Sequence, residues 1–418
     1  MESQHGEIPE AVGRLSSPLR RNRDFVLLQT GQLLSQSGTQ VASIAYPLLV
    51  LSLSGSATLA GVVGFAGFIA EAVFALPAGL LADRWSRKRL MIASDALRFG
   101  MIAVVTGLIV SGELALWIIP LAAFVEGFGS SFFEAAQQGA LRAVVPATQL
   151  PAAINVVTGR RAAVNIAGPP IGGALFGLAR ALPFLVDAVS YAFSTLSLLA
   201  MRTPFEEQRD APTPRAKGQM LEGFRFVWSH PFLRTTMLVF APLGFVGMSY
   251  TLAVIIIAKE QGLSGSAVGA LVASFGAGVL LGSAISPQIR RKLPVRAVLL
   301  LELWMWAVPI VFLAWPNVYV LGVSLLPAAL AVPSSDSVAG AYRLLLTPDR
   351  LIGRVSSAIT TVSFLPVPFG QLVTGFLLGV TSPRVTVAFF VAVALICALV
   401  ATLSPALRSL PSIADRPA

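Results

Sequence analysis

The chain has 418 residues, of which 55% are hydrophobic and 12% are charged, and its mean hydropathy is +0.78. Because soluble globular proteins carry about 25% charged residues, this composition argues against a water-soluble enzyme and indicates a protein that lies in the lipid bilayer. The net charge of +10 does not indicate a nucleic-acid partner, because the Lys and Arg residues are dispersed among apolar runs, as is typical of membrane orientation.

Twelve long apolar segments follow a polar N-terminal tail. Roughly 20 apolar residues are needed to cross about 30 Å of hydrocarbon. The segments therefore predict an all-α membrane protein with twelve transmembrane helices, at about 25–51, 58–81, 90–110, 114–139, 153–178, 182–201, 236–257, 266–288, 297–314, 317–341, 356–379 and 384–403. The expected organisation is a tail at 1–24, a six-helix N-terminal bundle at 25–201, a linker at 202–235, a six-helix C-terminal bundle at 236–403 and a tail at 404–418.

The basic residues predict the orientation in the membrane. With the N-terminus inside, Arg180, Lys259 and Arg384 are the basic residues of the outer loops, and nearly all others lie in inner loops and tails. Inner loops of membrane proteins are enriched in Lys and Arg. The first tail has no apolar core, so we do not expect a cleavable signal there. The prediction is a multi-pass plasma-membrane protein with both termini and the linker in the cytoplasm.

The first predicted helix carries a polar stripe. Its members are spaced by three or four residues, which places them on one helix face: Gln29, Gln32, Gln36, Gln40 and Ser43. Because polar side chains in contact with lipid are costly, we expect this face to point into the bundle. The glutamines then either line a transport path and bind substrate, or hydrogen-bond to neighbouring helices.

The loop after the second predicted helix has a distinctive sequence, GLLADRWSRKR at residues 79–89. It resembles the G-x-x-x-D-R-x-G-R-K loop signature of the major facilitator superfamily, with Ser86 in place of the second glycine. The resemblance implies two six-helix bundles around one central cavity that opens alternately to the two sides of the membrane. It also implies a gating loop that latches the outward-facing state by contacts with the second bundle, formed by Gly79, Asp83, Arg84, Arg87 and Lys88. A basic loop that only sets the orientation is the alternative.

Seven acidic residues fall within the predicted spans: Glu71, Asp95, Glu126, Glu134, Asp187, Glu302 and Asp336. Glu71 and Glu126 lie near the middle of their helices, where an apolar environment disfavours the charged form of a carboxyl group and so suits reversible protonation. They are the candidate coupling residues. A buried carboxyl group that only bonds to a neighbouring helix is the alternative for each.

The other ionisable groups in the spans are assigned structural roles. Asp95 and Arg98 are three residues apart, so they share a helix face and are expected to form an ion pair near the cytoplasmic surface. Glu134 is expected to pair with a basic residue of the 84–89 loop. Three further acids lie near predicted helix ends and are expected to be partly hydrated: Asp187, Glu302 and Asp336.

The fifth predicted helix contains the sequence GPPIGG at residues 168–173. It resembles the G-P-x-x-G-G core of the superfamily's antiporter motif, which assigns the motif positions to Gly168, Pro169, Gly172 and Gly173. Small residues permit close helix packing and prolines favour a bend. A bent packing helix without a role in transport is the alternative.

The eleventh predicted helix contains Pro366, Pro368 and Gly370, which predict an interruption, and Gln371 beside them is a further candidate for lining the cavity. In the fourth helix, Ala123 stands where many proton-coupled exporters of the superfamily have arginine, so the resemblance does not carry that proton relay to this chain. Over its length, including the Phe-rich stretch 124–133, the sequence is most similar to the macrolide and siderophore exporter branch, the transmembrane secretion effectors.

Together these features predict a secondary transporter that exports an amphipathic small molecule, such as a drug, a macrolide or a siderophore-like compound, by alternating access in exchange for protons. The alternatives are a lipid or lysolipid translocator, or an importer, of the same fold. A non-transporting membrane receptor is the alternative from a different class.

An enzyme is not expected, because no nucleophile and base are paired in the sequence and no phosphate-binding loop is present. His5 and His230 are the only histidines and lie outside the predicted spans, and Cys397 is the single cysteine. We therefore expect no metal site and no cofactor. The expected partners are the small-molecule substrate, protons as the coupling ion and the lipid bilayer, and the expected state is a monomer.

Overall fold

The computed structural model describes residues 19–203, 205 and 216–408, and all regular elements within them are helical. Most of the first tail, the residues 204 and 206–215 of the linker, and residues 409–418 of the second tail lie outside the described residues. The long helices of the first half are α1 (Arg23–Ser54), α2 (Ala57–Arg84), α3 (Arg87–Ser111), α4 (Ile118–Val144), α5 (Leu150–Leu178) and α6 (Leu182–Ala200).

The second half contains more, shorter helices. After α7 (Ala216–Ser229) and α8 (Pro231–Glu260), its elements are α9 (Gly265–Lys292), α10 (Val295–Met305), α11 (Val311–Ala314), α12 (Val318–Leu346), α13 (Ile352–Phe364), α14 (Pro366–Val380), α15 (Pro383–Leu403) and α16 (Pro405–Arg408). The predicted interruption at Pro366 is confirmed, because α13 ends at Phe364 and Pro366 begins α14. Pro309 lies in a similar break of the span 297–314, which divides into α10 and α11.

Local capping explains where the helices begin and end. The Asn22 side chain accepts a hydrogen bond of 3.1 Å from the amide of Phe25, which starts α1 two residues before the predicted span. At the other end, Gly55 has a φ of 64°, a left-handed conformation that stops the helix at low cost for glycine. The apolar pattern alone does not reveal these caps, so α1 extends beyond its predicted span of 25–51 at both ends.

The predicted linker 202–235 is partly helical. α7 occupies residues 216–229, and α8 begins at Pro231, five residues before the predicted bundle boundary at 236. Glu222 of α7 forms an ion pair with Arg354 of α13, and Gly223 allows α7 to approach the backbone of the same residue. This segment is polar because it contains a surface helix, α7, which packs against α13.

Ten helical stretches are long and apolar enough to cross a membrane, by length and composition among the described residues. Two other long helices, α1 and α5, are not among them. Both carry polar residues at mid-helix, including the glutamine stripe of α1 and Asn165 of α5, and these residues face protein or cavity. The twelve-helix membrane fold is thus formed with two spans that depend on partners to cover their polar groups.

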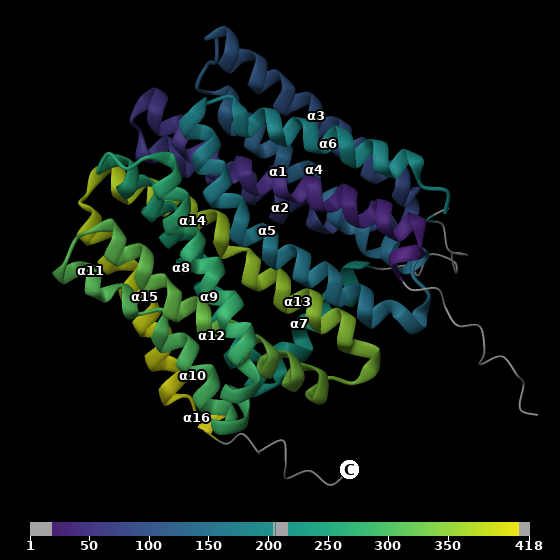
Figure 1. The fold of residues 1–418 in the computed structure, drawn as a ribbon. Coiled ribbons are helices and arrows are strands. Elements are labelled where there is room, and N and C mark those ends of the chain that lie inside the picture. The colour runs from purple at the N-terminus through teal and green to yellow at the C-terminus, as the bar shows by residue number, and fades with distance from the viewer. Residues whose placement is uncertain (1–18, 204, 206–215, 409–418) are drawn as a thin grey trace, which may run out of the picture.

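The helices gather in two bundles (Figure 1), one from the first half of the chain, coloured purple to teal, and one from the second half, green to yellow. The bundles meet along two seams, α2 against α14 and α5 against α9. Glycines let the backbones touch there: Gly61 lies against Gly375, and Gly173 against Gly265. These contacts lie near the start of α2 and α9, at the membrane side opposite to α7.

Candidate functional site

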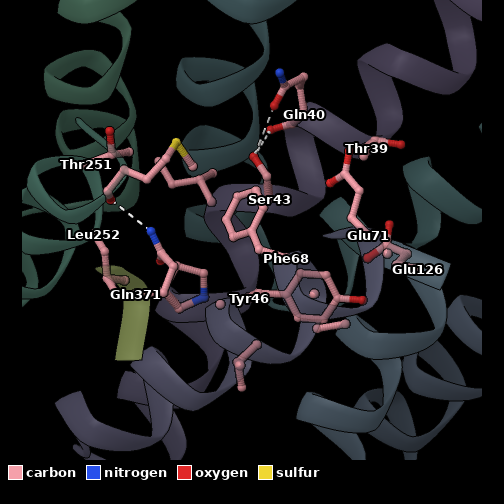
Figure 2. A pocket seen from close by; sticks show the side chains of 18 of the residues that line it. Thr39, Gln40, Ser43, Tyr46, Phe68, Glu71, Glu126, Thr251, Leu252 and Gln371 are labelled. Atoms are coloured by element: carbon pink, nitrogen blue, oxygen red, sulfur yellow. Dashed lines mark hydrogen bonds between the residues drawn. The ribbon is translucent and has the colours of Figure 1, made fainter. Parts of the chain in front are cut away.

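Two cavities share part of their lining: one of about 300 Å³ lies between the bundles, and one of about 290 Å³ lies beside it against the first bundle. The larger is lined mainly by apolar side chains of both bundles, with a few polar groups among them. Figure 2 shows Glu71 and Glu126 on the side of the first bundle, and Gln371 with Thr251 and Leu252 on the opposite side. The smaller cavity is lined by first-bundle residues. Such a surface suits an apolar molecule that also carries a few hydrogen-bonding or charged groups.

The polar stripe of α1 both lines these cavities and bonds to other helices. Gln32, Gln36 and Gln40 line the smaller cavity, and Gln40 and Ser43 line the larger. Gln32 accepts a 2.6 Å hydrogen bond from the Gln137 side chain of α4, and Gln40 donates to Asn165 of α5. Gln29 lines neither cavity.

Gln371 reaches the larger cavity from α14, beside the seam with α2. Its side-chain amide donates a 2.9 Å hydrogen bond to the carbonyl of Met248 in α8, and its side chain lies against Gly64 of α2. The residue is buried and lines the larger cavity. It therefore joins three helices at the point where the two bundles meet.

Glu126 of α4 is held in a hydrogen-bonded chain. The Tyr191 hydroxyl of α6 donates to its carboxylate at 3.0 Å, and the hydroxyls of Tyr191 and Thr39 lie 2.9 Å apart. Glu126 also faces the larger cavity, and the Tyr46 hydroxyl points toward it (Figure 2). This carboxyl group therefore connects the cavity surface to polar groups buried among α1, α4 and α6.

Glu71 of α2 has a different setting. Its side chain lines the larger cavity without a hydrogen bond or ion pair to any described residue, and only its backbone carbonyl is engaged, by the Ser131 hydroxyl at 3.0 Å. The two candidate coupling residues thus share one cavity wall. Glu126 is fixed by partners, whereas Glu71 is open to a ligand or water.

Asp95 and Arg98 form an ion pair inside the first bundle, where Asp95 is fully buried and Arg98 is 5% exposed. The guanidinium carbon of Arg98 lies 4.4 Å from the ring centre of Tyr191 and 5.0 Å from that of Phe133. α6 and α4 cover this face of α3, so the pair is buried within the bundle. Arg98 also lines both cavities, so the ion pair holds a charged side chain at the cavity wall.

Replacing Asp95 by Asn should destabilise the protein by about 3 kcal/mol, because it leaves a buried guanidinium without its carboxylate. Glu134→Gln is the matched control, since its partner Arg161 and Glu134 itself are 45% and 38% exposed, and such pairs contribute less than about 1 kcal/mol. Unfolding of the purified variants in mixed micelles measures both. Equal losses in the two variants would contradict the assignment.

The predicted gating loop makes no close packing around Gly79, where a Cβ would meet no atom within 4 Å. Asp83 is exposed. Lys88 donates a 2.8 Å hydrogen bond to the Met201 carbonyl, and Arg87 lies against Gly139 of α4. Lys88 and Arg87 thus contact their own bundle, and the two bundles diverge away from the glycine seams (Figure 1).

The helix 5 motif lies between two helices. Gly168 and Gly172 face α1, against Gln40 and the Val41 carbonyl, while Gly173 faces the Gly265 carbonyl of α9. The carbonyl of Pro169 similarly touches Gly269 of α9. The glycines therefore let α5 pack tightly against α1 of its own bundle and against α9 of the opposite bundle. The sequence motif alone does not indicate which glycine faces which helix.

Asp187, Glu302 and Glu134 lie in surroundings that differ from the expected ones. Asp187 is fully buried and lies beside Gly38 in the middle of α1, and Glu302 is 5% exposed, so the expected hydration of both is wrong. Asp336 is exposed. Glu134 pairs with Arg161 of α5 instead of the 84–89 loop, because α4 and α5 face each other across the smaller cavity.

No cluster of His, Cys, Asp and Glu in the described part of the chain is arranged to hold a metal ion. Two helical bundles, a central cavity between them and glycine seams on one side are features of a membrane transporter. A family model described as transmembrane secretion effector matches residues 15–417. The chain belongs to this family of major facilitator transporters.

The names of similar proteins are consistent with this family. The chain is 25% identical to the multidrug efflux pump Tap of Mycolicibacterium fortuitum over 411 residues, which cover 94% of this chain and 98% of Tap. It is 22% identical to the macrolide efflux protein A of Streptococcus pyogenes over 62% of this chain and 64% of that protein. Both relatives are efflux proteins by name, so the exporter branch of the superfamily is shown.

The fold of this secretion effector family member is also similar to solved transporters. A bacterial homologue of the human lysosomal transporter Spinster, in an inward-facing and unoccupied conformation, matches with a TM-score of 0.73 at 16% identity, over 96% of this chain and 99% of that one. The major facilitator fold predicted from the 79–89 loop is therefore confirmed. The chain is a multi-pass membrane transporter for a small molecule.

Proposed function

We propose that this transporter exports an amphipathic small molecule from the cytoplasm in exchange for protons. The observation that carries the proposal is the larger cavity, where an apolar wall from both bundles meets the carboxyl groups of Glu71 and Glu126. An apolar wall binds the hydrophobic part of a ligand, and buried carboxyl groups exchange protons. The efflux relatives support export over import.

The orientation supports loading from the cytoplasm. The seams α2–α14 and α5–α9 join the bundles at the side opposite to α7, and the bundles diverge away from these seams (Figure 1). Positively charged loops are retained on the cytoplasmic side. We therefore assign the open end, the linker and both termini to the cytoplasm. In this proposal a single monomer forms the complete cavity.

Each group of residues takes a separate part in this proposal. Glu126 exchanges protons, because its hydrogen-bonded chain with Tyr191 and Thr39 holds it at the cavity wall. Glu71, Gln36, Gln40 and Gln371 contact the substrate, since they line the cavities. Substrate binding and proton binding then compete in one space, as exchange requires.

Alternating access requires the two glycine seams to part while the opposite ends close. Gly173 and Gly61 would leave their partners on the second bundle, and Asp83 and Arg84 of the gating loop would approach it. Packed helix interfaces change between such arrangements as rigid bodies. The loop contacts that Gly79 now lacks belong to that second state.

Cells that overproduce the chain should accumulate less of a transported compound than cells without it, and a protonophore should remove the difference. A panel of macrolides, amphipathic drugs and lysolipids identifies which class moves. If accumulation of every compound is equal with and without the chain, export is contradicted. If only lysolipids respond, the protein is a lipid translocator instead.

A further inference from the structure

Asp187 of α6 is a second buried carboxyl group behind Glu126. It is fully buried, and neither of its carboxyl oxygens has a hydrogen-bond partner of good geometry. Gly38 of α1 makes room for it, since a Cβ at that position would lie 2.8 Å from Asp187 Oδ1. Glu126 faces Asp187 from α4. Asp187 does not line either cavity, so it reaches the cavity only through Glu126.

The charges around these two carboxyl groups do not balance if both are ionised. Arg98 of α3 is the cation that faces them, and Asp95 already pairs with it. Among the described residues, the other polar neighbours are the hydroxyls of Tyr46 from α1 and of Ser190 and Tyr191 from α6. Hydroxyl donors stabilise one carboxylate, but two adjacent carboxylates away from water repel each other strongly.

We propose that Glu126 and Asp187 form a carboxyl pair that keeps one shared proton and exchanges a second proton with the cavity through Glu126. When the pair holds two protons it is neutral. Release of one proton from Glu126 to cavity water leaves a single negative charge, which the Tyr191 hydroxyl and Arg98 stabilise. The proton that stays with Asp187 prevents a second charge. Asp187 thereby positions the exchangeable proton at the cavity surface.

This inference rests on the proposed proton exchange for its role in transport, but its test requires no substrate. Infrared spectra of the purified protein in lipid nanodiscs, recorded from about pH 5 to about pH 10, report protonated carboxyl groups by their C=O stretching band. Two interacting acids lose their protons in two separated steps that belong to the pair. Asp187→Asn and Glu126→Gln remove one member each and keep the shape of the site.

We expect each variant to replace the two steps by one that lies between them, at least about one pH unit away from either. The matched control is Glu71→Gln, which removes a cavity carboxyl outside the pair. Its spectral change should add to that of Asp187→Asn, whereas the changes of Asp187→Asn and Glu126→Gln should not add. If Asp187→Asn removes only its own band and leaves the band of Glu126 unchanged, the proposed carboxyl pair is overturned. This holds even if the protein still exports its substrate normally. A normal pair in a protein without transport would instead contradict the proposed function alone.

Discussion

Replacing Glu126 by Gln should abolish transport driven by a proton gradient while substrate binding remains. The amide keeps the size of the side chain and can still accept from the Tyr191 hydroxyl, but it cannot release a proton at the cavity wall. We expect uptake into inside-out vesicles to fall at least about 100-fold, within the range that removal of a general acid or base has on proton-transfer steps. The equilibrium affinity of the purified protein for the substrate should change by less than about threefold, because the contacts that bind the substrate are kept.

Glu302→Gln is the control for this prediction. Glu302 is also a buried glutamate of a membrane helix, at 5% exposure, but it lines neither cavity. Its replacement should leave gradient-driven uptake within about twofold of the unchanged protein, since no proton exchange with the cavity is lost. Unchanged uptake in Glu126→Gln would remove that residue from the coupling mechanism.

Replacing Gly173 by Leu should force the α5–α9 seam apart and stop transport. A side chain there would run into the backbone carbonyl of Gly265, which has no flexible end to move away. Overpacking of this kind costs about 1–3 kcal/mol, and each 1.4 kcal/mol changes a conformational equilibrium about tenfold. The fraction of protein molecules in which the α5–α9 seam is closed should therefore fall. A cysteine placed at Ala60, in a Cys397→Ser background, should then react faster with an impermeant maleimide added outside.

Gly177→Leu serves as the matched control, because it lies one turn further along α5, where a Cβ would meet nothing within 4 Å. It should leave both transport and labelling at Ala60 unchanged. If Gly173→Leu labels and transports like Gly177→Leu, the seam is not a gate.

The fold was predictable because it depends on local patterns. Apolar runs long enough for the bilayer predict the helices, and the 79–89 loop predicts the superfamily. The pairing of Asp95 with Arg98 follows from a spacing of three residues on one helix. Helix ends were less predictable, since Asn22 caps α1 through a side chain outside the apolar run.

The site depends on contacts between helices far apart in the sequence, which no spacing reveals. Glu126 and Tyr191 meet because α4 and α6 both pack on α3. Asp187 is buried beside Gly38 because a glycine lets α6 approach α1, whereas its place in the sequence suggested a hydrated helix end. The rarity of acids within membrane spans was the available signal for Asp187. Glu134 and Arg161 likewise pair across two helices.

Transport measured in proteoliposomes with the luminal pH recorded tests the central claim most directly. We expect substrate movement in one direction to be accompanied by proton movement in the other, with both lost in Glu126→Gln and both retained in Glu302→Gln. Substrate movement that leaves the luminal pH constant, and that continues at the same rate when the proton gradient is collapsed, would contradict proton-coupled exchange by this transporter.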